Sequence, residues 1–154
     1  MKQPFAGFFI VLAAALLASA GAAGQGEGSG FTENAMNIRL IVDGAVLRAT
    51  LEDNAASRDF AALLPLELTL SDYHGIEKIA DLPSRLSTDG VPEGVDPEIG
   101  DITYYAPWGN LALFYGDFGY ARGLVRLGRI QGGVERLADS DTVDVRIERV
   151  EAAQ

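Results

Sequence analysis

The side chains best suited to ligand binding lie in one aromatic-rich stretch, residues 104–120. More than half of the chain's phenylalanine, tyrosine and tryptophan residues fall within it. Aromatic side chains bury about 150 to 250 Å² each and either fill cores or line ligand clefts. We predict that Tyr105, Trp108 and Phe118 border a groove over one face of the fold. Packing of the same residues in the core is the alternative.

Two arginines that follow this stretch are predicted to contact the same ligand, Arg122 and Arg126. In an extended strand, Arg126 shares a face with Leu124 and lies opposite Val125. Its guanidinium therefore pairs with a buried or pocket carboxylate, or else forms an ordinary surface ion pair of small energetic value.

Catalytic and metal-binding residues are harder to find in this chain. His74 is the single histidine and there is no cysteine, so the common histidine- and cysteine-rich metal sites cannot be built. A lone histidine can act as a general base, but an exposed turn residue is the favoured interpretation. The carboxylates along residues 89–101 lack the alternating spacing of a calcium loop and indicate a solvated acidic loop. We predict no metal and no cofactor, and we assign no catalytic residue.

The elements that position these residues begin with a β-hairpin. Apolar residues alternate over 38–42, Asp43-Gly44 supplies a two-residue turn, and residues 46–51 return as a second strand. A short helix follows, with Asn54 or Ser57 as its N-cap and Pro65 beyond its end. One apolar stripe runs along this helix and is expected to cover the open end of a curved sheet: Ala56, Phe60, Leu63 and Leu64.

The rest of the chain alternates short strands with turns. Strands are predicted over 65–70, 102–105, 111–115, 124–127 and 143–147. Residues 71–81 indicate a turn with a further short strand, 82–99 and 116–123 are predicted loops, and 134–138 form at most two helical turns. Many short strands without a βαβ rhythm predict a mainly β fold, a closed or nearly closed antiparallel barrel with one or two short capping helices.

The N-terminus carries the features of a secretory signal peptide. Lys2 precedes an apolar run over 8–17 and small residues follow, so residues 1–22 are predicted to be cleaved on export. The run is shorter than the about 20 residues of a membrane span, although an uncleaved anchor is the alternative. We further predict a flexible leader over 23–35, one domain over 36–150 and a disordered tail over 151–154.

We predict a bacterial protein that is exported to the periplasm or secreted, and its composition restricts its partners. The chain has 22 acidic and 12 basic side chains, a net charge of −10. This balance repels phosphate backbones and anionic lipids, so we expect neither nucleic acid nor, after signal-peptide removal, membrane as a partner.

The order of the pieces resembles the cyclophilin-like fold, in particular the small prokaryotic cyclophilin-like proteins. The resemblance covers roughly residues 36–150. It is carried by the following segments: the Asp53–Phe60 helix, Leu64-Pro65-Leu66, Gly100-Asp101 and Leu127-Gly128-Arg129-Ile130. It implies an antiparallel barrel.

The residues that the resemblance associates with prolyl isomerase activity are missing. Between residues 70 and 100 there is neither the arginine with its phenylalanine neighbour nor the Gln-Gly-Gly-Asp segment, and Leu124 stands where the isomerases have a histidine. Gln131-Gly132-Gly133 belongs to a later part of the fold.

Together these observations predict an exported cyclophilin-like domain that binds a peptide or small ligand in an aromatic-lined groove. The alternative is a peptidyl-prolyl cis-trans isomerase with non-standard residues. A third interpretation makes the aromatic surface an interface between subunits. The sequence leaves the oligomeric state open.

Overall fold

The structure, a computed structural model, describes residues 35–151. The predicted signal peptide, nearly all of the predicted leader and residues 152–154 lie outside this range. Within it, none of the helices is long and apolar enough to cross a membrane.

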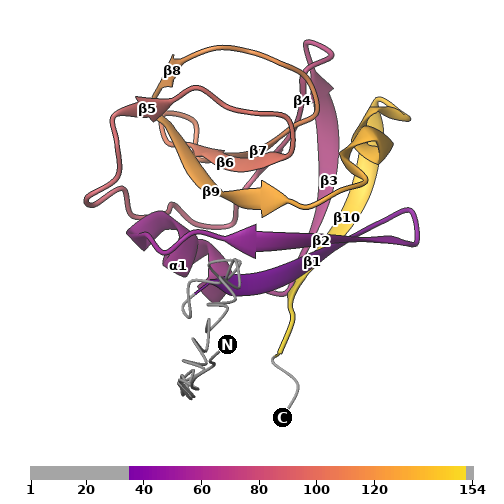
Figure 1. The fold of residues 1–154 in the computed structure, drawn as a ribbon, viewed down its shortest axis with the longest axis horizontal. Helices are drawn as coiled ribbons and strands as arrows, with labels where there is room; N and C mark the ends of the chain where they lie inside the picture. The colour runs from indigo at the N-terminus through magenta and orange to yellow at the C-terminus, as the bar shows by residue number, and fades with distance from the viewer. Residues whose placement is uncertain (1–34, 152–154) are drawn as a thin grey trace, which may run out of the picture. The chain divides into compact units, whose positions relative to one another are not determined.

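Eight strands of the described chain close into an antiparallel barrel in the order β1-β10-β3-β4-β7-β6-β9-β2 (Figure 1). The barrel strands are β1 (Met36–Val42), β2 (Ala45–Leu51), β3 (Leu66–Tyr73), β4 (Glu77–Asp81), β6 (Asp101–Tyr105), β7 (Asn110–Phe114), β9 (Leu124–Ile130) and β10 (Thr142–Arg149). The predicted fold class is confirmed.

Four short elements of residues 35–151 lie outside the barrel sheet. They are helix α1 (Ala55–Ala62), the 3₁₀ helix η1 (Val134–Ala138), and the two-residue strands β5 (Gly94–Val95) and β8 (Ala121–Arg122). β5 and β8 pair with each other as a separate antiparallel ribbon. Both fall in segments predicted as loops, because two-residue strands leave no alternation to detect.

The β1–β2 hairpin turns at the predicted position. Asp43 and Gly44 have φ angles of 47° and 81°. Two successive positive φ values characterise the tight turn whose twist matches that of paired strands, and an Asp-Gly pair favours it. The turn sets the register, in which Val42 pairs with Ala45 and Met36 with Leu51.

Helix α1 is joined to the barrel by its cap and by one aromatic side chain. Asn54 is the N-cap, and its Oδ1 accepts a hydrogen bond of 2.8 Å from the Ser57 backbone N–H. Ser57, the other predicted cap, instead donates its hydroxyl to the Leu127 carbonyl at 2.8 Å. Phe60 is completely buried in the barrel core, as the apolar stripe predicts.

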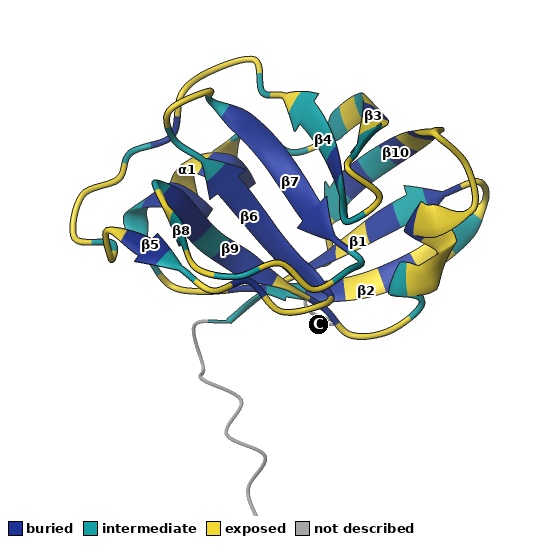
Figure 2. Cartoon of the chain, turned by 90° about the horizontal axis from the view of Figure 1, so that it is seen from above, coloured by how far each residue is buried: buried dark blue, intermediate teal, exposed yellow. Residues whose placement is uncertain are grey.

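The strands in the middle of the sheet are buried on both faces. Figure 2 shows β6 and β7 almost entirely in the colour of buried residues. Leu111 and Leu113 of β7 face the barrel core, while Ala112 and Phe114 belong to a second apolar cluster on the outer face. Apolar sequences on both faces are typical of such covered strands.

The predicted end of the 124–127 strand was wrong. Gly128 does not end its strand, because β9 continues to Ile130. A Cβ at Gly128 would lie 2.2 Å from the Thr50 carbonyl oxygen, so glycine is required there by the close approach of β2. The turn and the further short strand predicted within residues 71–81 are both present: the turn lies at His74-Gly75, where both φ values are positive, and β4 begins at Glu77.

Candidate functional site

The outer face of the wall β4-β7-β6-β9 carries a second apolar layer. Buried Ala112, Phe114 and Leu124 form its base, and Val95 of β5 and Ala121 of β8 pack onto them. The β5–β8 ribbon therefore covers part of this outer face. Beside the ribbon the cover is incomplete, and a pocket of about 340 Å³ remains.

Aromatic side chains make up the walls of this pocket, which we call the aromatic pocket. They are Tyr73, Tyr105, Trp108, Phe114, Phe118 and Tyr120. Its volume is at the lower end of the range of about 300 to 1,000 Å³ that is usual for small-molecule sites.

Three of these aromatic side chains are unusually exposed. Trp108, Phe118 and Tyr120 have relative exposures of 58%, 59% and 64%. Trp108 is nevertheless held in place, because its ring meets Tyr105 and Tyr73 edge to face with centroids 5.4 and 5.9 Å apart. The turn between β6 and β7 fixes its backbone, since the Trp108 N–H donates to the Tyr105 carbonyl at 3.2 Å.

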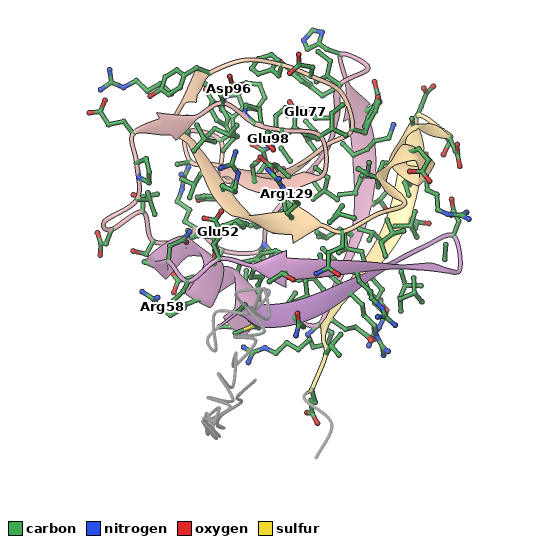
Figure 3. All side chains as sticks on the ribbon, in the orientation of Figure 1. Glu52, Arg58, Glu77, Asp96, Glu98 and Arg129 are labelled. Carbon is green, nitrogen blue, oxygen red and sulfur yellow. The ribbon has the colours of Figure 1, made fainter. Side chains whose placement is uncertain are left out.

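One carboxyl group lines the aromatic pocket, that of Glu77 (labelled in Figure 3). Glu77 begins β4, where it pairs with Tyr73 of β3 and Phe114 of β7. Among the described residues its side chain makes no hydrogen bond and no ion pair. Burial raises the pKa of Glu77 to about 7, because the charged form loses hydration without gaining a partner. The group can therefore hold or release a proton near neutral pH.

Asn110 is a further polar residue that lines the aromatic pocket. The residue is only 4% exposed, and its Nδ2 donates to the Leu111 carbonyl at 3.3 Å. Within residues 35–151, its Oδ1 is buried without a hydrogen-bond partner. Buried acceptors are rarely left unpaired, so this oxygen is an unsatisfied polar group of the pocket wall.

Four of the five predicted ligand-contacting residues line the aromatic pocket: Tyr105, Trp108, Phe118 and Arg122. Arg122 lies at the rim, where its side chain is 79% exposed and its Nη2 is 3.6 Å from a Glu93 carboxylate oxygen. The core-packing alternative does not describe Trp108 and Phe118. That they bind a ligand stays a prediction.

Arg126, the fifth predicted residue, lies outside the aromatic pocket and pairs with a buried carboxylate. Its Nε is 2.8 Å from Asp101 Oδ2, and the Nε of Arg129 is 2.9 Å from Asp101 Oδ1. Asp101 is completely buried. Arg129 also pairs with Glu98 at 2.6 Å, and the labels in Figure 3 show these two side chains together.

A β-bulge brings both arginines to one carboxylate. Arg126 and Arg129 are three positions apart, so in a regular strand they would face opposite sides. The register of β9 against β6 shifts between Ile102 and Thr103, and this irregularity turns both side chains to the outer face. Through Glu98, this network joins the end of the loop that precedes β6 to the barrel wall.

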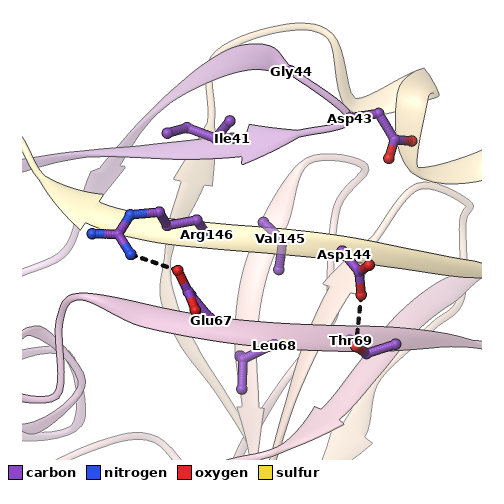
Figure 4. Close-up of a pocket in the computed structure, with 9 residues that line it drawn as sticks. All are labelled: Ile41, Asp43, Gly44, Glu67, Leu68, Thr69, Asp144, Val145 and Arg146. Atoms are coloured by element: carbon purple, nitrogen blue, oxygen red, sulfur yellow. Dashed lines mark hydrogen bonds and ion pairs between the residues drawn. The ribbon is translucent and has the colours of Figure 1, made fainter.

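A larger pocket of about 490 Å³ lies between β1, β10 and β3 (Figure 4). Its charged and polar groups are largely paired with one another. Arg146 Nη1 is 2.7 Å from Glu67, and the Thr69 hydroxyl donates to Asp144 at 2.6 Å. Groups that already satisfy one another offer little to a ligand, so the smaller aromatic pocket is the better candidate site.

The other residues considered for chemistry remain apart in the fold. His74 is exposed in its turn, and its ring packs edge to face on Tyr73 with centroids 4.2 Å apart. In the described part of the chain, no three histidine, cysteine, aspartate or glutamate side chains are grouped so that they could hold a metal ion.

The family model of the cyclophilin-like family matches residues 40–148, which is most of the chain. The chain belongs to the cyclophilin-like family. The resemblance stated from the sequence is thereby confirmed. No curated protein matches the chain significantly.

Two solved structures share the fold of this cyclophilin-like protein. The solution structure of the hypothetical protein AF2241 from Archaeoglobus fulgidus is 21% identical with a TM-score of 0.55, covering 75% of this chain and 95% of that one. The structure of McbB in complex with tryptophan is 12% identical with a TM-score of 0.55, covering 76% of this chain and 46% of McbB. This chain thus spans less than half of McbB, and at these identities the likeness shows the fold alone.

Sequence reasoning missed Glu77, Asn110, Tyr73 and Tyr120 as pocket residues. Glu77 stands next to Lys78, and such a pair is typical of a solvated surface. The available signal was the period of the strand, because Glu77 shares a face with Ile79, which packs on the outer apolar cluster. Glu77 would then have been expected among aromatic neighbours.

Proposed function

We propose that this cyclophilin-like protein is a binding domain that takes a small ligand, or one side chain of a peptide, into the aromatic pocket. The observation that carries the proposal is the set of exposed but fixed aromatic rings around a cavity, centred on Trp108 and Phe118. Exposed aromatic groups of this kind are uncommon on surfaces without a binding role. Rings held before binding also lose little conformational freedom when a ligand arrives.

A fluorescence titration tests this proposal, because Trp108 is the only tryptophan of the chain. The probes are a tetrapeptide library and a library of small aromatic and amine fragments. We expect saturable changes in Trp108 emission. Removing one wall in Phe118→Ala should weaken the binding at least about tenfold.

Val46→Ala is the matched control for Phe118→Ala. Val46 is 58% exposed, as much as Trp108, but it lies on β2 and does not line the aromatic pocket. Its affinities should equal those of the parent protein. Hits that Phe118→Ala and Val46→Ala affect alike would contradict the proposal. So would concentration-dependent dimers that Phe118→Ala abolishes, because the surface would then be a subunit interface.

The isomerase alternative gains no support from this site. Leu124, which stands where the isomerases have a histidine, is a buried apolar residue at the base of the pocket. A proline-limited refolding assay separates the two functions. We expect the slow phase, which lasts tens to hundreds of seconds, to be unchanged by substoichiometric protein.

We also propose that the protein is exported and that residues 1–22 are removed on the way. The support is the pattern of the sequence alone, since these residues lie outside the described range. Mass spectrometry of protein from the periplasm or medium should show an N-terminus shortly after residue 20. A full-length chain in the membrane fraction would instead indicate an uncleaved anchor.

A further inference from the structure

We infer that the aromatic pocket binds an organic ammonium group, with Glu77 as its counter-ion and the aromatic rings as its walls. The inference rests on the proposed function, because it names the ligand class of the same site.

Within residues 35–151, no cationic side chain pairs with Glu77. Lys78, the next residue, faces the opposite side of β4 and pairs with Asp72, with an Nζ to Oδ1 distance of 2.9 Å. Arg122 stands at the rim, where its described ion pair is with Glu93. A half-buried carboxylate without a partner is unfavourable. A ligand cation of suitable size would supply the missing charge.

The aromatic walls of the pocket also favour a cation. The faces of aromatic rings carry negative electrostatic potential and attract ammonium groups, indole most strongly. Edge-to-face contacts hold the ring of Trp108 against those of Tyr105 and Tyr73. The ring centroids of Phe118 and Phe114 are 6.1 Å apart. Carboxylate and aromatic rings therefore favour the same ligand charge from different sides of the cavity.

Uncharged and anionic ligands fit this pocket less well than an ammonium group. An uncharged aromatic ligand would displace water from Glu77 and give it nothing in return. An anion would be repelled by the same carboxylate, and Arg122 is exposed and partly neutralised by Glu93.

This assignment makes binding depend on pH with a definite sign. The elements around Glu77 contribute the following titratable or charged groups to the pocket: Tyr73, Tyr105, Tyr120 and Arg122. The Glu77 carboxyl, with a pKa of about 7, changes its charge near neutral pH. A cation that requires the ionised carboxylate should bind about 30-fold more weakly at about pH 5.5 than at about pH 8.5.

The experiment compares three probes of one shape and different charge by NMR titration of the whole protein. They are 2-phenylethylammonium, 2-phenylethanol and 3-phenylpropanoate, each up to about 10 mM because fragments of this size bind weakly. At about pH 8.5 the ammonium should bind at least about tenfold more tightly than the alcohol, and the propanoate most weakly. Glu77→Gln should remove this preference and its pH dependence, because the ammonium loses its counter-ion and the alcohol no longer displaces water from a carboxylate.

Two control variants keep the outcomes distinct. Phe118→Ala should weaken all three probes. His74→Gln should leave the pH dependence intact, although the His74 ring packs on Tyr73 of the pocket wall. An alcohol or propanoate that binds as well as the ammonium would overturn the ammonium assignment and leave the binding function standing. If no probe perturbs resonances of the aromatic pocket at the highest concentration, the ammonium assignment falls. If the peptide and fragment libraries also give no saturable hit, the proposed function falls with it.

Discussion

Glu77 and Asp101 lie on the outer wall of the same barrel and have opposite surroundings. Asp101 is completely buried, and two guanidinium groups and the Glu98 backbone N–H bind its carboxylate. Glu77 is half-buried among aromatic rings, and in the described structure nothing binds its carboxyl group. The fold thus satisfies one carboxylate from within and leaves the other open to a cavity.

The difference separates a structural site from a candidate functional one. The Asp101 network joins the end of the long loop to β9, and its partners are all supplied by the chain. At Glu77 the burial of a carboxyl without a partner is an unfavourable arrangement that the surrounding fold has to offset. Such arrangements concentrate at binding and catalytic sites, where the missing partner is the ligand.

The largest effect is expected from replacing Asp101, the carboxylate whose partners are supplied by the chain. Asp101→Asn leaves Arg126 and Arg129 facing a neutral amide, so we expect the free energy of unfolding to fall by about 3 kcal/mol. Urea denaturation measures the loss. Glu98→Gln is the control, because Glu98 is an exposed partner of Arg129 and its removal should change stability by less than about 1 kcal/mol. Equal effects of the two variants would refute a special role for the buried carboxylate.

The second prediction concerns Glu77, the carboxyl group without a partner in the described structure. The folded-state pKa of Glu77, about 7, lies above the ordinary value of 4.5, so the folded state binds the proton more tightly. The parent protein therefore loses stability as pH rises from about 4.5 to about 7. Glu77→Gln removes this loss and should be more stable than the parent by about 1 to 2 kcal/mol above pH 7. This value is lower than the pKa shift alone would give, because the pocket is open to solvent and water screens the charge.

The control for this pH series is Glu135→Gln, since Glu135 is exposed on η1. Its stability should follow that of the parent at every pH. At about pH 4, where Glu77 is protonated in both states, Glu77→Gln should match the parent as well. A constant difference between variant and parent across the pH range would rule out titration of Glu77 as the cause.

A smaller effect is expected at a third carboxylate, Asp72 of β3. The hydroxyl of Tyr115, then Lys78 and the Gly75 N–H, lower the pKa of Asp72 from 3.8 to about 2. Its stabilising contribution is therefore present above pH 3.8 and lost as pH falls towards about 2. Tyr115→Phe removes one of these three hydrogen bonds and should move the NMR titration of Asp72 towards 3.8. Tyr120→Phe, on an exposed ring, should leave it in place.

The smallest effect is predicted at the rim of the aromatic pocket. Arg122 and Glu93 are both largely exposed and 3.6 Å apart. Such a pair contributes little, so Arg122→Gln should change the free energy of unfolding by less than about 0.5 kcal/mol. Thermal denaturation checks this value. A loss comparable to that of Asp101→Asn would mean that Arg122 belongs to a structural network.

Much of the barrel could be predicted because its signals are local. The Asp43-Gly44 turn, the Asn54 cap and the alternation of residues 143–147 each specify a short piece of backbone, and the pieces in order indicate the fold. The continuation of β9 through Gly128 could not be predicted, because glycine there answers to the approach of β2, which is distant in sequence. Of the residues predicted to border a groove, Tyr105, Trp108 and Phe118 of the aromatic stretch line one cavity, together with Arg122.

The chemistry of the pocket depended on register and was therefore missed. Glu77 and Lys78 look alike as a surface pair, yet β3 and β7 place Glu77 beside aromatic rings and bury Lys78 with Asp72. Arg126 and Arg129 converge on Asp101 only because β9 is bulged against β6. Spacing within β4 places Glu77 on one face with Ile79, but the neighbouring strands that supply the partners in both arrangements cannot be deduced from one strand.

The central claim is that the Glu77 carboxyl group has no partner in the free protein and pairs with a ligand cation. Carbon-13 NMR of the Glu77 carboxyl carbon tests this claim most directly. The account predicts a titration midpoint near pH 7 in the free protein. It also predicts that saturating 2-phenylethylammonium moves this midpoint downwards and that 2-phenylethanol does not. A midpoint near 4.5 that neither compound moves would contradict it.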